Sequence, residues 1–207
     1  RDNANIVNAN ALRIDWNDVI PANKLNYIMG NPPFIGKKEQ SPIQKEELIS
    51  LFSNKIRVGN IDYVIGWYKK AVNLIERQHI KAAFVSTNSI TQGEQAPMLQ
   101  KLIFSENKFQ IDFAYRTFTW SNQAKGKAAV HCVIIGFSQN SLPNNKQIFL
   151  EGGSSVQVQN INTYLVDAPS ISIFSRSIPL CEVKPMIYGS MPIDNGALIL
   201  SIEEKNE

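Results

Sequence analysis

A short apolar run that ends in Gly-Asn-Pro-Pro most constrains what this chain can fold into. Residues Leu25–Met29 are long enough for one strand, and Gly30-Asn31-Pro32-Pro33 follows at once. Consecutive prolines cannot continue a strand ladder because proline lacks the backbone N–H, and glycine relieves crowding at the bend. The pattern therefore predicts a buried strand that runs into a tight loop, with Asn31 directly after the strand.

Strand-like and helix-like segments alternate on both sides of this loop. Residues Ala11–Asp15 alternate in hydropathy like the end of a strand, and Lys81–Ser86 is a second apolar run. The Ser41–Gln44 sequence has a cap residue, a proline at the first helical position and a glutamine at the third, so it predicts a helix through about Leu51. This order is typical of an α/β fold with a parallel, doubly wound sheet, which binds ligands at the carboxyl ends of its strands.

Two further helices are expected from apolar residues that recur at three- and four-residue steps. One begins at Asn60 or Asp62 and carries an apolar stripe from Val64 to Ile75, which we assign to the core. The other covers about Pro97–Phe104, after a polar loop.

The second half of the chain is rich in predicted strands. Phe109–Phe118 and Val130–Phe137 leave no room for a helix between them, so we expect an antiparallel hairpin at one edge of the sheet. Short β-like pieces follow at Gln147–Leu150 and Val156–Asn160. The predicted fold is thus α/β: part of a doubly wound sheet with a terminal antiparallel hairpin and a β-rich tail. We place one domain at residues 1–166 and a linker with the start of another at 167–207.

Composition excludes several classes of protein. The 207 residues are 43% hydrophobic and 19% charged, the balance of a globular protein with a core. No apolar window reaches the roughly 18 residues of a membrane span, so no membrane partner is expected. Cys132 and Cys181 lack metal-ligand spacing, so we expect no metal site and a reduced, cytoplasmic protein. A net charge of +3 is too small to argue for a polyanionic partner.

The N-terminus indicates a fragment. The chain begins with Arg1-Asp2-Asn3, without an initiator methionine and without the basic-then-apolar order of a signal peptide. We therefore expect it to begin inside a longer protein.

The Asn31–Phe34 sequence carries the chemistry. Methyl transfer to an exocyclic amine requires the nitrogen lone pair to be freed from ring conjugation, and two acceptors for the amine hydrogens achieve this without a general base. The carboxamide of Asn31 and the carbonyl of Pro32 can be those acceptors, held in place by the prolines. Phe34 offers an aromatic face to a base extruded from the stack.

In these residues the chain resembles amino-group DNA methyltransferases that use S-adenosylmethionine, specifically the N6-adenine type with Asn-Pro-Pro-Tyr/Phe. Three words, Asn31–Gly36, Phe84–Ile90 and Phe118–Asn122, resemble the MmeI-like group of restriction–modification enzymes. The resemblance covers about residues 5–165. It implies the C-terminal half of a class I methyltransferase domain that transfers a methyl group to a flipped adenine in double-stranded DNA.

The resemblance also implies roles for individual residues. Ala11–Trp16 matches a motif whose acidic residue, Asp15 here, accepts a hydrogen bond from the cofactor's adenine, while Trp16 lines the same pocket. Asn31 and Pro32 bind the target amine. Pro33 belongs to the catalytic motif and borders the cofactor. The expected DNA and base contacts are Phe34, Trp120 with Phe118 as runner-up, and the lysines Lys37, Lys125 and Lys127.

The family's glycine-rich cofactor loop has no match in this chain and would precede residue 1. The expected partners are therefore double-stranded DNA and the remainder of the same polypeptide, namely an N-terminal cofactor-binding half and a C-terminal target-recognition domain. The fragment alone is expected to be inactive.

Alternatives remain open at this point. The same tetrapeptide serves enzymes that methylate RNA bases or protein amides, and a non-catalytic nucleic-acid-binding module could retain the fold. Asp15 could be a solvated carboxylate, Lys37 a solvated lysine and Trp120 a cap on the hairpin. The hairpin and the β-rich tail favour DNA.

Overall fold

The structure is a computed structural model in which residues Arg1–Phe174 form one compact unit and Ser175–Glu207 a second. Most of the first unit is described, together with a few residues of the second. The predicted functional boundary between residues 166 and 167 stays a prediction. The described residues are 4–52, 60–76, 78–104, 109–120, 130–139, 146–176, 178, 181–183, 201–203 and 205.

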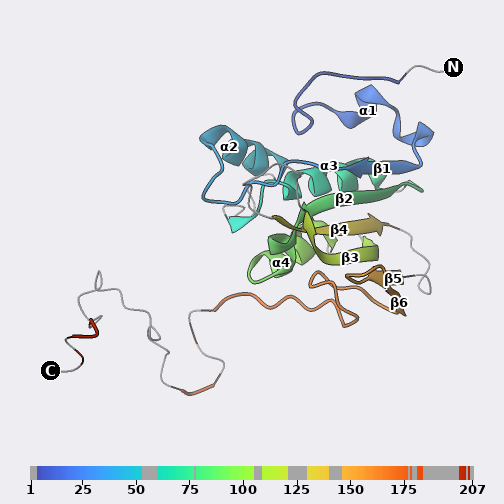
Figure 1. Ribbon diagram of the computed structural model, residues 1–207. Coiled ribbons are helices and arrows are strands. Elements are labelled where there is room, and N and C mark those ends of the chain that lie inside the picture. Colours follow the sequence, from blue (N-terminus) through green and yellow to red (C-terminus); the bar gives the residue numbers. More distant parts are fainter. Residues whose placement is uncertain are drawn as a thin grey trace. The chain divides into compact units, whose positions relative to one another are not determined.

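The first unit contains a six-stranded mixed sheet with the strand order β1-β2-β4-β3-β5-β6 (Figure 1). β1 and β2 are parallel, β4 is antiparallel to both β2 and β3, β5 is parallel to β3, and β6 is antiparallel to β5. Together with the helices this is an α/β fold, as predicted. The strands are β1 (Tyr27–Gly30), β2 (Lys81–Thr87), β3 (Gln110–Trp120), β4 (Val130–Ser138), β5 (Lys146–Phe149) and β6 (Ser155–Val158).

β1 is an edge strand, and the prediction that it is buried was wrong. Among the described strands it pairs with β2 alone, in a register that sets Gly30 opposite Phe84. Tyr27 is 66% exposed and Met29 82% exposed, and their spacing of two residues places both on the same face of the sheet. The predicted position of Asn31 directly after this strand is confirmed.

The hairpin of β3 and β4 forms as predicted, but it does not lie at the edge of the sheet. The two β-like pieces expected in the tail are β5 and β6, and β5 pairs with β3 to extend the sheet beyond the hairpin. β5 pairs with β3 from Phe113↔Gln147 to Tyr115↔Phe149, and the rings of Tyr115 and Phe149 stack with centroids 5.2 Å apart.

Residues Ala11–Asp15 form a turn, so the prediction of a strand end there was wrong. The carboxamide oxygen of Asn10 accepts the N–H of Leu12 at 3.0 Å, and the carbonyl of Asn10 accepts the N–H of Arg13 at 2.9 Å. These local bonds occupy the backbone groups that a strand would need. The alternation arises instead because Leu12 alone is buried, against Gly66 and Leu48.

The predicted helices are present. α2 (Pro42–Leu51) begins with the expected capping box, in which Ser41 accepts the N–H of Gln44 and the Gln44 side chain accepts the N–H of Ser41. α3 (Ile65–Ile75) follows Asp62, whose carboxylate accepts the N–H of Val64. The third helix is α4 (Gln95–Leu99), which continues as the π-helical η4 (Gln100–Phe104). Shorter helical turns are α1 (Trp16–Val19), η1 (Ala22–Lys24) and η3 (Asn88–Thr91).

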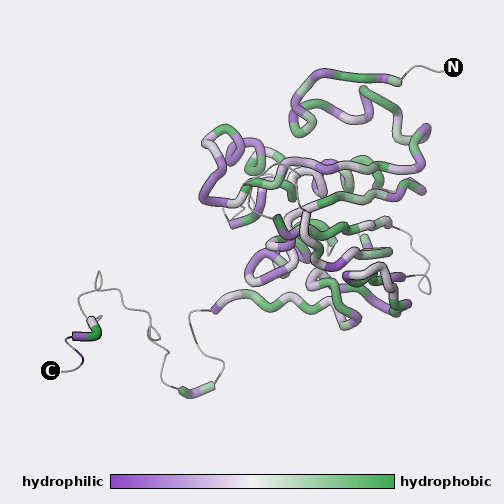
Figure 2. Tube along the Cα trace, in the orientation of Figure 1, coloured by the Kyte–Doolittle hydropathy of each residue, from purple (hydrophilic) through white to green (hydrophobic). Residues whose placement is uncertain are grey.

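The core lies between α3 and the β2–β4 region of the sheet, where hydrophobic stretches run along the strands (Figure 2). Tyr68 of α3 is fully buried, stacks on Phe137 with centroids 5.3 Å apart, and meets the edge of Phe84 at 5.2 Å. Its hydroxyl shares a 2.9 Å hydrogen bond with Ser86. The core therefore holds β2, whose Phe84 lies beside the end of β1.

An irregularity in β3 brings an aromatic ring onto a glycine of β4. The register shifts between Ile111 and Phe113, so that Phe113 pairs with Gly136. A Cβ atom at Gly136 would lie 2.0 Å from Cε1 of Phe113, closer than any normal contact. Position 136 thus requires glycine for its lack of a side chain.

We expect Gly136→Ala to lower the free energy of unfolding by about 1–3 kcal/mol, because the added methyl group forces the Phe113 ring out of its place. Gly36→Ala is the matched control, since an added Cβ at Gly36 meets nothing within 4 Å. Chemical denaturation of the chain measures both. Equal stability of the two variants would contradict this account of the β3–β4 packing.

Candidate functional site

A cavity of about 460 Å³ lies at the carboxyl end of β1. Asn31, Pro32 and Pro33 line it, as does Trp16. The structure therefore brings together three of the four predicted catalytic residues and two of the three predicted cofactor residues, Trp16 and Pro33. The other lining residues are Ile28, Met29, Gly30, Trp67 and Phe84.

The Asn31 carboxamide is available for a ligand. Asn31 is exposed, Pro32 is buried and Pro33 is exposed, so the prolines anchor the turn on one side only. The carboxamide makes no hydrogen bond to any described part of the chain. A side chain with one strong acceptor and two donors, held at a cavity without a partner, is suited to bind a polar group.

Phe34 lies outside the lining of this cavity. It is half-buried and packs against the core. The stacking of Phe34 on a flipped base stays a prediction.

Trp16 connects this cavity with a second, more polar one of about 510 Å³. The indole Nε1 donates to the carbonyl of Ala11 at 2.7 Å, which fixes the ring. Asp15 lines the second cavity, where its carboxylate caps α1 by accepting the N–H of Asn17 at 2.9 Å. Asp15 and Asn31 thus border neighbouring cavities that share one tryptophan. The remaining residues of the second cavity are Arg13, Asn17, Ala22, Lys70, Asn73 and Leu74.

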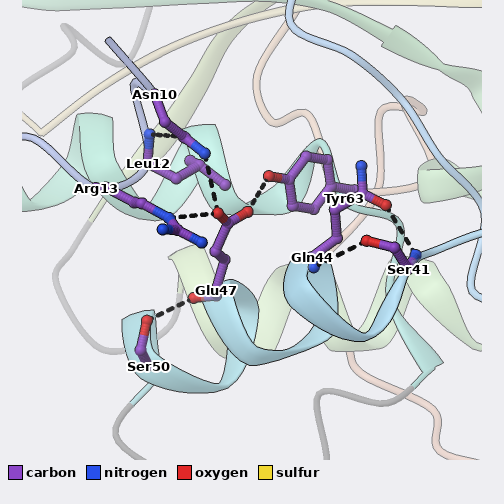
Figure 3. A network of polar contacts seen from close by, with 8 residues as sticks. All are labelled: Asn10, Leu12, Arg13, Ser41, Gln44, Glu47, Ser50 and Tyr63. Atoms are coloured by element: carbon purple, nitrogen blue, oxygen red, sulfur yellow. Dashed lines mark hydrogen bonds and ion pairs between the residues drawn. The ribbon is translucent and has the colours of Figure 1, made fainter.

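A buried carboxylate, Glu47 of α2, holds the segment that carries Asp15 and Trp16 (Figure 3). It accepts hydrogen bonds from the side chains of Asn10 at 2.9 Å, Arg13 at 2.6 Å and Tyr63. The three donors come from the turn before α1 and from the segment before α3, so one side chain joins α2 to both.

The donors around Glu47 determine its charge. Burial alone would raise its pKa, but the hydrogen bonds from Tyr63, Arg13 and Asn10 and the charge of Arg13 outweigh burial, so the pKa lies below its ordinary value of 4.5. Burial and the neighbouring Glu47 raise the pKa of Tyr63, which therefore stays a protonated donor. A carboxyl group whose pKa falls on folding stabilises the fold above its unfolded pKa.

We expect the wild-type chain to lose stability as the pH falls below about 4.5, because Glu47 must then be protonated at the expense of these bonds. Glu47→Gln should lower the free energy of unfolding by about 1–3 kcal/mol at neutral pH and reduce this loss in acid. Arg13 contributes little of this stabilisation, because its side chain is 60% exposed and solvent screens its charge. Denaturation of the wild-type chain and of Glu47→Gln at pH 7 and pH 3.5 measures both effects. If Glu47→Gln lost as much stability in acid as the wild type, Glu47 would not be the group responsible.

Phe118 and Trp120, the candidates for a second stacking residue, lie at the same end of the sheet as Asn31, where β1, β2 and β3 have their carboxyl ends. β3 is parallel to β1 and β2 because β4 is antiparallel to its neighbours on both sides. Phe118 and Thr87 both pair with Cys132, and Trp120 lies two residues farther along and is 44% exposed. Phe118 is half-buried, with its ring centroid 6.3 Å from that of Trp120. Neither residue lines the cavities, so the choice between them as a stacking residue stays a prediction.

The predicted phosphate contacts are only partly described. Lys37 is exposed, and its ammonium group donates to the side chain of Asn60. Lys125 and Lys127 lie outside the described residues. Contact of these lysines with a nucleic-acid backbone stays a prediction.

Within the described residues, no three His, Cys, Asp or Glu side chains are grouped closely enough to hold a metal ion. No helix of that same part is long and apolar enough to cross a membrane. Cys132 is buried and Cys181 exposed, both as free thiols.

Sequence reasoning missed Trp67 as a residue of the site. The apolar stripe of α3 was assigned to the core, and Tyr68, Ala71, Val72 and Ile75 are indeed buried there. Trp67 instead is half-buried, lines the cavity beside Asn31, and meets Tyr63 edge to face at 5.2 Å. The available signal was a tryptophan at the margin of the stripe, one residue before the fully buried Tyr68.

Comparison with known proteins identifies the family. Residues 1–150 match the family described as MmeI, DNA-methyltransferase domain. The chain belongs to this family of restriction–modification DNA methyltransferases. It is 39% identical over 199 residues to DNA methyltransferase A of Bacillus subtilis (strain 168), which covers 95% of this chain and 22% of that protein.

A solved structure gives the same result for the fold. The Type IIL restriction–modification enzyme MmeI in complex with DNA is similar with a TM-score of 0.86 and 45% sequence identity. The match covers 98% of this chain and 28% of the MmeI chain. The chain therefore spans less than a third of either relative. The predicted resemblance to MmeI-like methyltransferases is confirmed.

Proposed function

We propose that this chain is part of an S-adenosylmethionine-dependent DNA methyltransferase that modifies adenine at N6. The observation that carries the proposal is the carboxamide of Asn31, which makes no hydrogen bond within the described residues and borders a cavity at the end of β1, in a chain of the MmeI family. At this position Asn31 Oδ1 and the carbonyl of Pro32 accept the two amine hydrogens. The nitrogen lone pair is thereby directed away from the ring, which lowers the barrier to its attack on a methyl group.

The residues around Trp16 fit the adenine end of the cofactor. Trp16 offers an aromatic surface fixed by its hydrogen bond to Ala11, and Asp15 offers a carboxylate acceptor for an exocyclic amine. When bound, S-adenosylmethionine supplies an electrophilic methyl group. Pro33, which lines the Asn31 cavity, separates the two ligands in this proposal.

Double-stranded DNA is the proposed substrate. Its adenine must leave the helix to reach Asn31, which costs a few kcal/mol of stacking and pairing. An aromatic face is worth about 1–3 kcal/mol per stacked base, and Phe34, Trp120 and Phe118 are the candidates for this contact. Lys37, Lys125 and Lys127 are the proposed phosphate contacts.

The remainder of the same polypeptide is the second proposed partner. The matched share of the MmeI chain is 28%, and β1, an edge strand among the described residues, exposes Tyr27 and Met29 on one face of the sheet. We assign the glycine-rich cofactor loop to the N-terminal part of the longer protein and target recognition to the part that begins near residue 167.

Asn31→Ala in the full-length parent should reduce methyl transfer by at least about 10²–10³-fold, because one acceptor for the developing charge is lost. DNA affinity should stay nearly unchanged, since the phosphate contacts are intact. Asn26→Ala is the matched control, because Asn26 is exposed just before the same strand and does not line the cavity. Transfer of labelled methyl groups to duplex DNA measures the rates. Wild-type turnover in Asn31→Ala would refute the assignment.

The isolated 207-residue chain should bind S-adenosylmethionine weakly or not at all, whereas the full-length parent binds it. Asp15 and Trp16 can hold the adenine end, but the proposed partners of the ribose and the methionine carboxylate lie elsewhere in the parent. Titration calorimetry on the two proteins compares them directly. A micromolar Kd for the isolated chain would contradict the division of the cofactor site.

A further inference from the structure

The residue directly after the Asn-Pro-Pro-Phe motif is held by a buried carboxylate. Asp62 is 3% exposed, and its Oδ1 atom accepts the N–H of Ile35 at 3.1 Å and the N–H of Val64 at 3.0 Å. One oxygen therefore joins the exit of the motif to the residue directly before α3. The bond to Val64 alone would be an ordinary local bond of an aspartate to the backbone two residues on. The bond to Ile35 is additional and connects a segment 27 positions away in sequence.

The carbonyl of Ile35 is held as well. It accepts the backbone N–H of Tyr63 at 3.1 Å and the carboxamide Nε2 of Gln40 at 2.9 Å. Gln40 is 7% exposed, and the same Nε2 also donates to the carbonyl of Ile61 at 2.9 Å. Both polar groups of the Ile35 backbone are thus bound by residues that precede α3 or follow the motif.

We call Asp62 and Gln40, which together hold the backbone of Ile35, the clamp. Asp62 is itself held by a residue of α4. The N–H of Asp62 donates to the carboxamide oxygen of Gln95 in α4 at 2.9 Å. Burial raises the pKa of Asp62, opposed by the hydrogen bonds from Val64 and Ile35, so keeping a carboxyl group here costs stability. Its two accepted hydrogen bonds offset this cost, because an apolar residue here would leave two backbone N–H groups without a partner.

Asp62 and Gln40 bind segments next to two residues that line the Asn31 cavity. Asn31 lies four residues before Ile35 in a segment stiffened by two prolines, so a shift of Ile35 moves the turn as a unit. Trp67, which also lines this cavity, lies in the first turn of α3, and the carboxylate of Asp62 accepts the N–H of Val64 directly before that helix. The position of the Asn31 carboxamide relative to Trp67 therefore depends on Asp62 and Gln40.

We propose that Asp62 and Gln40 are positioning residues, which hold Ile35 so that the Asn31 carboxamide and the Pro32 carbonyl meet the target amine. This inference rests on the proposed function. Neither side chain touches the substrate. Each acts through the backbone of Ile35.

The test uses the full-length parent with three variants. Asp62→Ala removes the acceptor for the N–H of Ile35, and Asp62→Asn keeps an oxygen that can accept the same two bonds. Gln40→Ala removes the donor to the carbonyl of Ile35. Asn160→Ala is the matched control, because its carboxamide donates to the carbonyl of Ala168 after β6, in a loop outside the cavities. Measured are kcat and KM for duplex DNA, the thermal midpoint, and hydrogen–deuterium exchange of the peptide that contains Ile35.

A misplaced turn should lower kcat about 10- to 100-fold in Asp62→Ala and Gln40→Ala, with KM for DNA changed less than threefold. Exchange at Ile35 should rise in both. Asp62→Asn should recover kcat to within about threefold of wild type, and Asn160→Ala should lower the thermal midpoint without lowering kcat. Wild-type kcat in Gln40→Ala or in a folded Asp62→Ala would overturn the proposal, as would an Asp62→Asn enzyme as slow as Asp62→Ala.

The exchange data separate this proposal from the proposed function. If the wild-type parent methylates adenine, the kcat values decide the role of the clamp even if Asp62→Ala does not fold, because Gln40→Ala carries the same test. If the wild-type parent does not methylate adenine, the proposed function fails. The clamp is then judged by exchange at Ile35, and protection equal to wild type in both Gln40→Ala and Asp62→Ala would overturn it.

Discussion

The backbone of Ile35 donates to Asp62 and accepts from Tyr63 and Gln40, and these bonds determine where the Asn31 turn can lie. A loop that leaves a strand through two prolines has few internal hydrogen bonds, because each proline lacks an N–H. Its position must therefore come from bonds farther along. The parallel pairing of β1 with β2 sets the start of the turn, and the bonds at Ile35 set its end.

Two buried carboxylates hold different parts of the site in place. Asp62 accepts backbone N–H groups at the end of the motif and before α3, whereas Glu47 accepts from side chains in the turn before Trp16 and from Tyr63. Their pKa values shift in opposite directions, since the donors around Glu47 outweigh burial and those around Asp62 do not. Trp16 and Asn31 thus meet at one cavity although separate networks hold them.

Local signals in the sequence predicted the elements that depend on local chemistry. The Ser41–Gln44 capping box, the strand before Asn31 and the apolar run of β2 all formed where they were expected. The failures concern tertiary neighbours. Hydropathy cannot show that β1 has one partner strand in the described part of the chain, that β5 continues the sheet past the hairpin, or that Asn10 binds the backbone of Leu12.

The site was predictable to the same extent. The turn residues follow from the sequence, because prolines and a carboxamide after a strand have few structural alternatives. Trp67 and Ile35 do not, since their roles depend on which helix packs beside the turn. The assignment of Phe34, Phe118 and Trp120 to a flipped base depends on a ligand, and the geometry of the protein alone leaves it a prediction.

The most direct test of the central claim is the identity of the modified nucleoside. The full-length parent is incubated with duplex DNA and S-adenosylmethionine, the DNA is digested to nucleosides, and these are separated by mass. The Asn31 site predicts that the product is N6-methyl-2′-deoxyadenosine, and that Asn31→Ala forms much less of it. Methylation of cytosine instead, or of RNA or protein and not of duplex DNA, would contradict it.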